Sequence, residues 1–81
     1  MESIEAQLKQ YISENILFSD AYPFSDETSF LENGVVDSMN VMELVAYVEE
    51  TYGVDVADSE IVPANFDSVR SLAGFLRNKG V

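Results

Sequence analysis

The chain has 81 residues, a formal net charge of -11, and neither cysteine nor histidine. This length predicts one small domain over residues 1–81. The missing side chains exclude a disulfide framework, a thiolate nucleophile and the usual general base near neutral pH. The acidity disfavours binding to nucleic acid or to an anionic membrane. No apolar run approaches membrane-spanning length and no signal-peptide pattern is present, so we expect a cytoplasmic protein.

The charged residues are unevenly distributed along the chain. Of the 15 acidic residues, all but Glu2 and Glu5 lie between Lys9 and Arg70, a stretch that contains no lysine or arginine. Such a field favours basic protein partners with fast, salt-sensitive association. Acidity also keeps small proteins in solution, and the distribution alone does not decide between these two roles.

The first part of the chain predicts one helix followed by a long connection. Apolar residues recur at helical spacing over residues 3–17, where Ser3 is placed to cap the helix. Residues 18–36 contain turn residues, yet they are too apolar for a solvated loop, and connections of this length are usually functional or held against the core. We therefore expect Phe30 and Leu31 to pack inward as anchors.

Residues 38–52 predict a second helix with two unlike faces, ended by Gly53. An advance of about 100° per residue places an apolar core face on one side. The core face consists of Val41, Leu44, Val45, Val48 and Tyr52. The outward residues, which we call the Met/Glu face, are Met39, Met42, Glu43, Ala46, Glu49 and Glu50.

The Met/Glu face is a candidate docking surface for partner proteins. Methionine is a soft contact residue that is common where one surface meets several partners. Glutamates around it would attract basic partners. Isolated apolar residues are also normal on protein surfaces, so an incidental surface is the alternative interpretation.

The last part of the chain predicts a connection over residues 54–67 and a final helix. Pro63 is suited to begin a short helical turn within that connection. Asp67 or Ser68 is suited to cap the final helix. The chain therefore predicts an all-α bundle of three main helices plus a short third helix.

The dipeptide Asp37-Ser38 opens the second predicted helix. Free backbone N–H groups and the positive end of the helix dipole gather at such a position, which favours a phosphate group there. Aspartate and serine before an apolar helix are also ordinary N-cap residues. Capping alone is thus the competing interpretation of this dipeptide.

The residues offer little catalytic chemistry of their own. A serine nucleophile needs a base, and no histidine is present. The spacing of the acidic residues does not match an EF-hand loop, and no glycine-rich phosphate loop occurs. We therefore expect no metal site and a protein that is not an enzyme.

Taken together, these segments resemble the acyl carrier protein family, the phosphopantetheine-dependent carriers. The resemblance is centred on residues 34–39 (Gly-Val-Val-Asp-Ser-Met), which are similar to the family's Asp-Ser-Leu/Met attachment motif. It continues through residues 41–45 and 48–54, and it ends in residues 61–69 and Leu72. The motif alone is weak, but its combination with the helical pattern and the downstream segment covers nearly the whole chain.

The resemblance implies a four-helix bundle with a short third helix and a carrier function. A phosphopantetheinyl transferase would move 4′-phosphopantetheine from coenzyme A to the Ser38 hydroxyl, and Asp37 would contribute to recognition by the transferase. The cargo would be bound as a thioester to the thiol of this arm. A chain without cysteine has no thiol of its own, so the cofactor would supply it. The Met/Glu face matches the family's recognition helix, where a loading ligase or transferase and a downstream synthase or transferase would dock.

Departures from the family's common patterns bear on the pathway. Met39 and Asn40 stand where fatty-acid carriers commonly have Leu and an acidic residue, and Val35-Val36 replaces the glycines of peptidyl carriers. We therefore favour a freestanding, monomeric carrier in a specialised polyketide, nonribosomal or aminoacyl pathway. The alternatives are a fatty-acid or D-alanyl carrier and, in a different class, an unmodified acidic helical adaptor that binds basic proteins.

Overall fold

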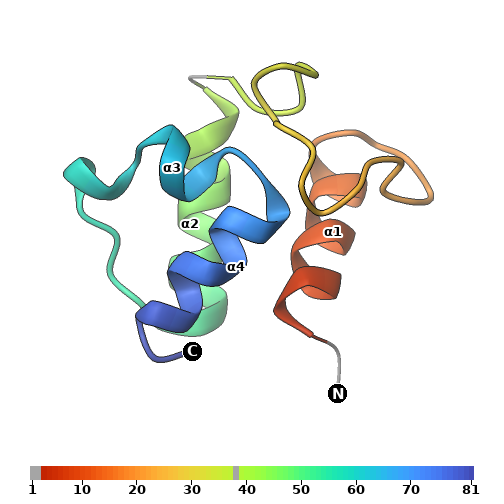
Figure 1. Cartoon of the computed structure of the whole chain (residues 1–81). Helices are drawn as coiled ribbons and strands as arrows, with labels where there is room; N and C mark the ends of the chain where they lie inside the picture. The colour runs from red at the N-terminus through yellow and green to blue at the C-terminus, as the bar shows by residue number, and fades with distance from the viewer. Residues whose placement is uncertain (1–2, 38) are drawn as a thin grey trace.

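The computed structural model describes residues 3–37 and 39–81, and all regular structure in these ranges is helical. Four α-helices follow one another, with a 3₁₀ turn between the second and the third (Figure 1). Their bounds are α1 Ile4–Asn15, α2 Asn40–Tyr52, η1 Asp58–Glu60, α3 Pro63–Phe66 and α4 Val69–Asn78. The predicted all-α bundle with a short third helix is confirmed.

Local capping explains where these helices begin and end. The Ser3 hydroxyl accepts the Ala6 N–H at 3.1 Å, and the Ser68 hydroxyl accepts the Ser71 N–H at 3.0 Å. Gly53 closes α2 with a φ of 68°, a left-handed conformation that glycine adopts without steric cost. The predicted cap at Ser3 and the predicted end of α2 are therefore confirmed, and of the two candidates for the cap of α4, Asp67 and Ser68, it is Ser68 that forms it.

Helix α1 ends at Asn15, before the predicted end at residue 17. The Leu17 N–H turns back to the Ile12 carbonyl at 2.9 Å, and Phe18 then takes a φ of 53°, which is uncommon for a bulky residue. The spacing of apolar residues does not reveal where α1 ends. Ile16 and Leu17 still pack against the core after the helix has ended, so they continue the apolar pattern.

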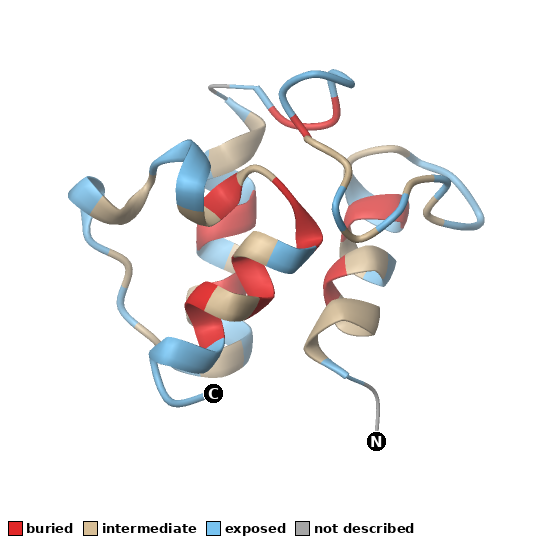
Figure 2. Cartoon of the chain, in the orientation of Figure 1, coloured by how far each residue is buried: buried red, intermediate tan, exposed pale blue. Residues whose placement is uncertain are grey.

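The core is built around α4, which packs against α1 on one side and α3 on the other (Figures 1 and 2). Leu44, Val45 and Val48 of the predicted core face of α2 are buried, and Val41 and Tyr52 are half-buried at its edge. The full set of buried apolar side chains is Leu8, Ile12, Phe30, Val35, Val36, Leu44, Val45, Val48, Phe66, Val69, Leu72, Ala73, Phe75 and Leu76.

The connection between α1 and α2 is anchored at Phe30 and not at Leu31. Phe30 is fully buried as predicted, but Leu31 is 55% exposed, so the prediction that Leu31 packs inward is wrong. The physical reason is a tight turn, in which the Val35 N–H donates to the Phe30 carbonyl at 2.9 Å. The Asp67 carboxylate holds this turn by accepting the Leu31 N–H at 3.0 Å and the Ser29 hydroxyl at 2.8 Å.

All four lysine and arginine residues form ion pairs with residues distant in sequence. The pairs are Lys9–Asp26, Arg70–Glu27, Arg77–Glu5 and Lys79–Glu60. Each pair involves α1, α4 or the residue that follows α4, and none involves α2. No lysine or arginine is therefore left to neutralise the carboxylates of α2.

Candidate functional site

Ser38 lies outside the described residues, but both of its neighbours are described and define the start of α2. The Oδ1 atom of Asp37 accepts the N–H groups of Met39 and Asn40, each at 2.8 Å. The Asp37 carbonyl accepts the Val41 N–H at 3.0 Å, as the residue before a first helical turn does. Asp37 therefore caps α2.

This cap changes one expectation drawn from the sequence. We expected free N–H groups at the start of α2 as a favourable place for a phosphate, but the N–H groups of Met39 and Asn40 donate to Asp37. These two bonds, with the one from Asn40 contributing most, lower the pKa of the Asp37 carboxyl. The ionised carboxylate thus takes the position at the helix N-terminus that an external anion would otherwise occupy.

The chain contains three Asp-Ser dipeptides, and their described residues have different structural roles. In Asp67-Ser68 the serine is buried and caps α4 while the aspartate anchors the connection. In Asp58-Ser59 both residues lie in η1, and Ser59 is exposed. At the third dipeptide Asp37 itself performs the capping, so the helix needs no serine hydroxyl for that purpose.

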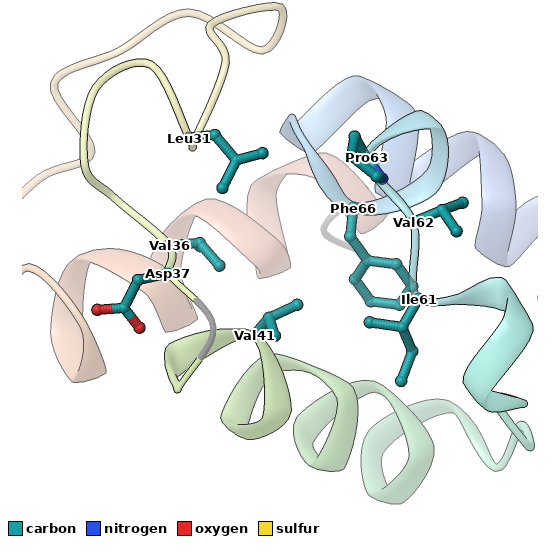
Figure 3. A pocket seen from close by; sticks show the side chains of 8 residues that line it. All are labelled: Leu31, Val36, Asp37, Val41, Ile61, Val62, Pro63 and Phe66. Atoms are coloured by element: carbon teal, nitrogen blue, oxygen red, sulfur yellow. The ribbon is translucent and has the colours of Figure 1, made fainter.

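An apolar cavity of about 220 Å³ lies beside the start of α2 (Figure 3). Its walls come from the connection, from α2 and from the segment around α3, and consist of Leu31, Val36, Asp37, Val41, Ile61, Val62, Pro63 and Phe66. Asp37 is the only charged residue in this set, and its carboxylate points away from the apolar side chains. The sequence did not reveal this cavity, because its walls come from segments that are separated along the chain.

Five of the six residues of the Met/Glu face are exposed in the structure. Met39 is 78% exposed and Met42 is 52% exposed, so two apolar side chains lie at the surface. Glu49 differs from the other five, because it is half-buried and its carboxylate accepts the Val56 N–H at 3.0 Å. Glu49 therefore ties the segment after α2 back onto the helix. The exposed members are Met39, Met42, Glu43, Ala46 and Glu50.

The described residues present no metal centre and no membrane span. Within residues 3–37 and 39–81, no three histidine, cysteine, aspartate or glutamate side chains come together in a way that could hold a metal ion. No helix in the same ranges has the length and apolar character needed to cross a bilayer. What the site offers is a serine next to a capped helix, an apolar cavity and an acidic surface that carries two methionines.

Comparison with known proteins shows similarity in sequence and in fold over most of the chain. The profile of the family described as "Phosphopantetheine attachment site" matches residues 6–76. The acyl carrier protein of Buchnera aphidicola subsp. Acyrthosiphon pisum is 28% identical over 81 residues, covering 100% of this chain and 98% of that protein. The probable acyl carrier protein PigG of a Serratia species is 27% identical, covering 91% of this chain and 85% of that protein. A chain in the crystal structure of an FAD-dependent dehydrogenase has a TM-score of 0.76 and 30% identity, covering 85% of this chain and 97% of that chain.

Proposed function

Because the chain belongs to the acyl carrier protein family, we propose that Ser38 is the residue to which its 4′-phosphopantetheine is attached. Members of this family are carriers and not enzymes, and 4′-phosphopantetheine is their cofactor. When bound, this group supplies a terminal thiol that holds an acyl or aminoacyl cargo as a thioester. A phosphopantetheinyl transferase would join the Ser38 hydroxyl oxygen to the phosphorus that bears the pantetheine arm of coenzyme A. This step would break the pyrophosphate bond of coenzyme A and release adenosine 3′,5′-bisphosphate, and the hydroxyl proton would pass to a base of the transferase or to water.

The observation that carries this proposal is the cap formed by Asp37. Its carboxylate already accepts two N–H groups of the first turn, so capping does not account for a serine at position 38. Asp37 and Met39, the residues on either side of Ser38 in the sequence, are both exposed and so available for contact with a transferase. Ser68 is a poor candidate for the attachment site, because it is buried and its hydroxyl is used as a cap.

The residues around the junction fit a covalently held arm. Asp37 would repel a second negative charge, so the phosphate would be held by its covalent bond and not by the helix N-terminus. The cavity walls formed by Val36, Val41 and Phe66 would offer apolar surface to the arm or to its cargo. In these roles neither Asp37 nor the cavity side chains need to react; only the Ser38 hydroxyl does.

The Met/Glu face supports docking of the enzymes that load and use the carrier. Met39 and Met42 would supply apolar contacts, and Glu43 and Glu50 would attract basic residues. Family membership supports synthases and transferases as the general class of partner. In this proposal a loading ligase or transferase and a downstream synthase or transferase take turns on this face.

The pathway we propose is a specialised polyketide, nonribosomal or aminoacyl pathway. The residues at Met39 and Asn40 favour it over fatty-acid synthesis, and the similarity to PigG is consistent with a freestanding carrier. Fatty-acid or D-alanyl transfer is the alternative within the same family.

An unmodified acidic adaptor is the second candidate function. It is favoured by the stretch between Lys9 and Arg70 that lacks basic residues, and by the α2 carboxylates that no lysine or arginine neutralises. In this case basic proteins would bind the same face without any arm on Ser38. The two candidates differ in whether Ser38 is needed.

The deciding experiment measures the intact mass after incubation with coenzyme A, magnesium and a broad-specificity phosphopantetheinyl transferase. The wild-type chain and Ser59→Ala, which changes the exposed serine of a different Asp-Ser dipeptide, should each gain one phosphopantetheine group. Ser38→Ala should gain none. A gain in Ser38→Ala would refute the attachment site, and no gain in the wild-type chain with two different transferases would favour the adaptor.

A further inference from the structure

A second hollow, of about 340 Å³, lies between α1 and α2 on another flank of α2. Unlike the apolar cavity, it is lined by aromatic, amide, hydroxyl and carboxylate side chains. The lining residues that matter below are Gln10, Tyr11, Glu14, Asn15, Tyr47 and Thr51. We call this hollow the tyrosine groove.

Two stacked rings form the wall of the tyrosine groove. Tyr11 of α1 and Tyr47 of α2 stack with their ring centroids 3.9 Å apart and their planes inclined by 20°. Tyr52 meets Tyr47 edge-on, and its hydroxyl donates to Gln7 Oε1 at 2.6 Å. These contacts fix both rings, so the groove has an aromatic wall of defined orientation.

The polar atoms around the rings include several hydrogen-bond acceptors. The Asn15 amide donates to the Tyr11 carbonyl at 3.1 Å, and the Gln10 amide donates to the Glu14 carboxylate at 3.2 Å. Since each amide nitrogen has this partner, the Asn15 and Gln10 amide oxygens provide acceptor capacity. The Glu14 carboxylate and the Thr51 hydroxyl add further acceptors, so a ligand rich in donors would match the groove.

The groove is also negatively charged. Glu14 lines it, and Glu43 and Glu50 lie one turn on either side of Tyr47 on the same flank of α2. Burial and then the charges of Glu43 and Glu50 contribute to raising the pKa of Tyr11. All lysines and arginines of the chain are paired elsewhere, so a second copy of the chain has no unpaired lysine or arginine to place here. The negative charge therefore favours a cation, and a partner protein is a source that has one to offer.

We propose that the tyrosine groove binds an arginine side chain of a partner protein. A guanidinium is planar, carries only donors, stacks on aromatic faces and pairs with carboxylates, which matches each feature of the groove. A lysine ammonium lacks the planar fork and would use the acceptors less well. Arginine binding does not require an arm on Ser38, so the test of the groove is independent of the test of the attachment site.

The first test is a nuclear magnetic resonance titration of the full, unmodified chain with N-acetyl-arginine amide. The ring signals of Tyr11 and Tyr47 should shift and saturate. N-acetyl-citrulline amide, which has nearly the same shape but no charge, should produce no saturable shift. A response to citrulline equal to that of arginine, equal affinity for N-acetyl-lysine amide, or the absence of saturation with arginine would overturn the proposal.

The second test uses two variants that each remove one exposed carboxylate. Glu14→Gln changes the groove, whereas Glu32→Gln changes the connection and serves as the control for net charge. Glu14→Gln should weaken arginine binding by about 1.4- to fivefold, the range measured for exposed ion pairs, and Glu32→Gln should leave it unchanged. Equal weakening by both variants would show only general attraction to an acidic protein and would overturn the assignment.

Discussion

The apolar cavity and the tyrosine groove share helix α2 but are built in different ways. The cavity draws most of its walls from the connection and the segment around α3, and its surface is mainly aliphatic. The groove lies between two long helices, and stacked rings support it. Because successive helical residues point about 100° apart, one helix presents separate flanks to two kinds of ligand. If both proposals hold, apolar recognition and cation recognition use separate flanks of the same helix.

The two hollows also depend on different supports, which allows each to be perturbed alone. The cavity depends on the turn that Phe30 and Asp67 hold against the core. The groove depends on the contact between Tyr11 and Tyr47. A substitution in one support should therefore leave the other hollow in place.

The largest effect is expected for Phe30→Ala, which removes the buried anchor on the cavity side. Loss of this fully buried ring should lower the free energy of unfolding by about 3–5 kcal/mol, as measured by urea denaturation. Phe18→Ala is the matched control, because the same side chain is 83% exposed there and its removal should change stability by no more than about 0.5 kcal/mol. Similar losses in both variants would contradict the assignment of Phe30 as the anchor.

A smaller loss is expected for Asp67→Ala, which leaves the anchoring turn without its acceptor. The Leu31 N–H and the Ser29 hydroxyl both lose their bond to the carboxylate, and stability should fall by about 2 kcal/mol. Hydrogen exchange of the Leu31 amide should become faster while the contacts between Tyr11 and Tyr47 persist. If those ring contacts were lost as well, the two supports would not be independent. Asp55→Ala, at an exposed position, provides the control for charge.

On the groove side, Tyr47→Leu removes the stack with Tyr11 and the edge contact with Tyr52. Stability should fall by about 1 kcal/mol, since aromatic pairs contribute roughly this much beyond their buried area. Tyr47→Phe keeps the ring and should preserve both stability and the stacking signals. Urea denaturation measures the loss, and an equal loss in Tyr47→Phe would assign the effect to the hydroxyl instead.

The smallest effect on stability is expected from lowering the pH, which acts on the cavity side by protonating Asp37. The folded-state pKa of Asp37 lies below its unfolded value of about 3.9 because the Asn40 and Met39 N–H groups bind the carboxylate. Its contribution to stability is therefore present above that unfolded value and is lost as the pH falls through the folded-state pKa. Urea midpoints measured across this acid range should decline less steeply in Asp37→Asn than in the wild-type chain. Identical slopes would show that the cap does not carry this dependence.

The helices, their caps and the exposed part of the Met/Glu face could be predicted because they depend on short-range patterns. Helical periodicity places Leu44 and Val48 in the core and Met42 outside it, whatever the rest of the chain does. Ser3 and Ser68 cap the helices that directly follow them. Such features need only a few neighbouring residues to be specified.

Features that depend on segments far apart in sequence could not be predicted. Leu31 and Phe30 have similar apolar character, and only the contact with Asp67 decides which of them turns inward. Aspartate and serine are equally good N-caps, so the sequence does not identify Asp37 as the capping residue. Helical periodicity assigns Tyr47 to neither the core face nor the Met/Glu face. Its stacking could not be predicted, because its partner Tyr11 lies on another helix.

The placement of the four ion pairs gives the molecule an electrical polarity. Lysine and arginine occur only on α1, on α4 and just after α4, whereas α2 carries three glutamates and no basic residue. The field of a basic enzyme would therefore exert a torque during diffusion and turn α2 towards the enzyme before contact. Salt at physiological strength screens charges over about 8 Å, so it acts on this orientation at long range more than on charges already in contact. The polarity thus sets how often a collision is productive, apart from how tightly the two proteins hold together afterwards.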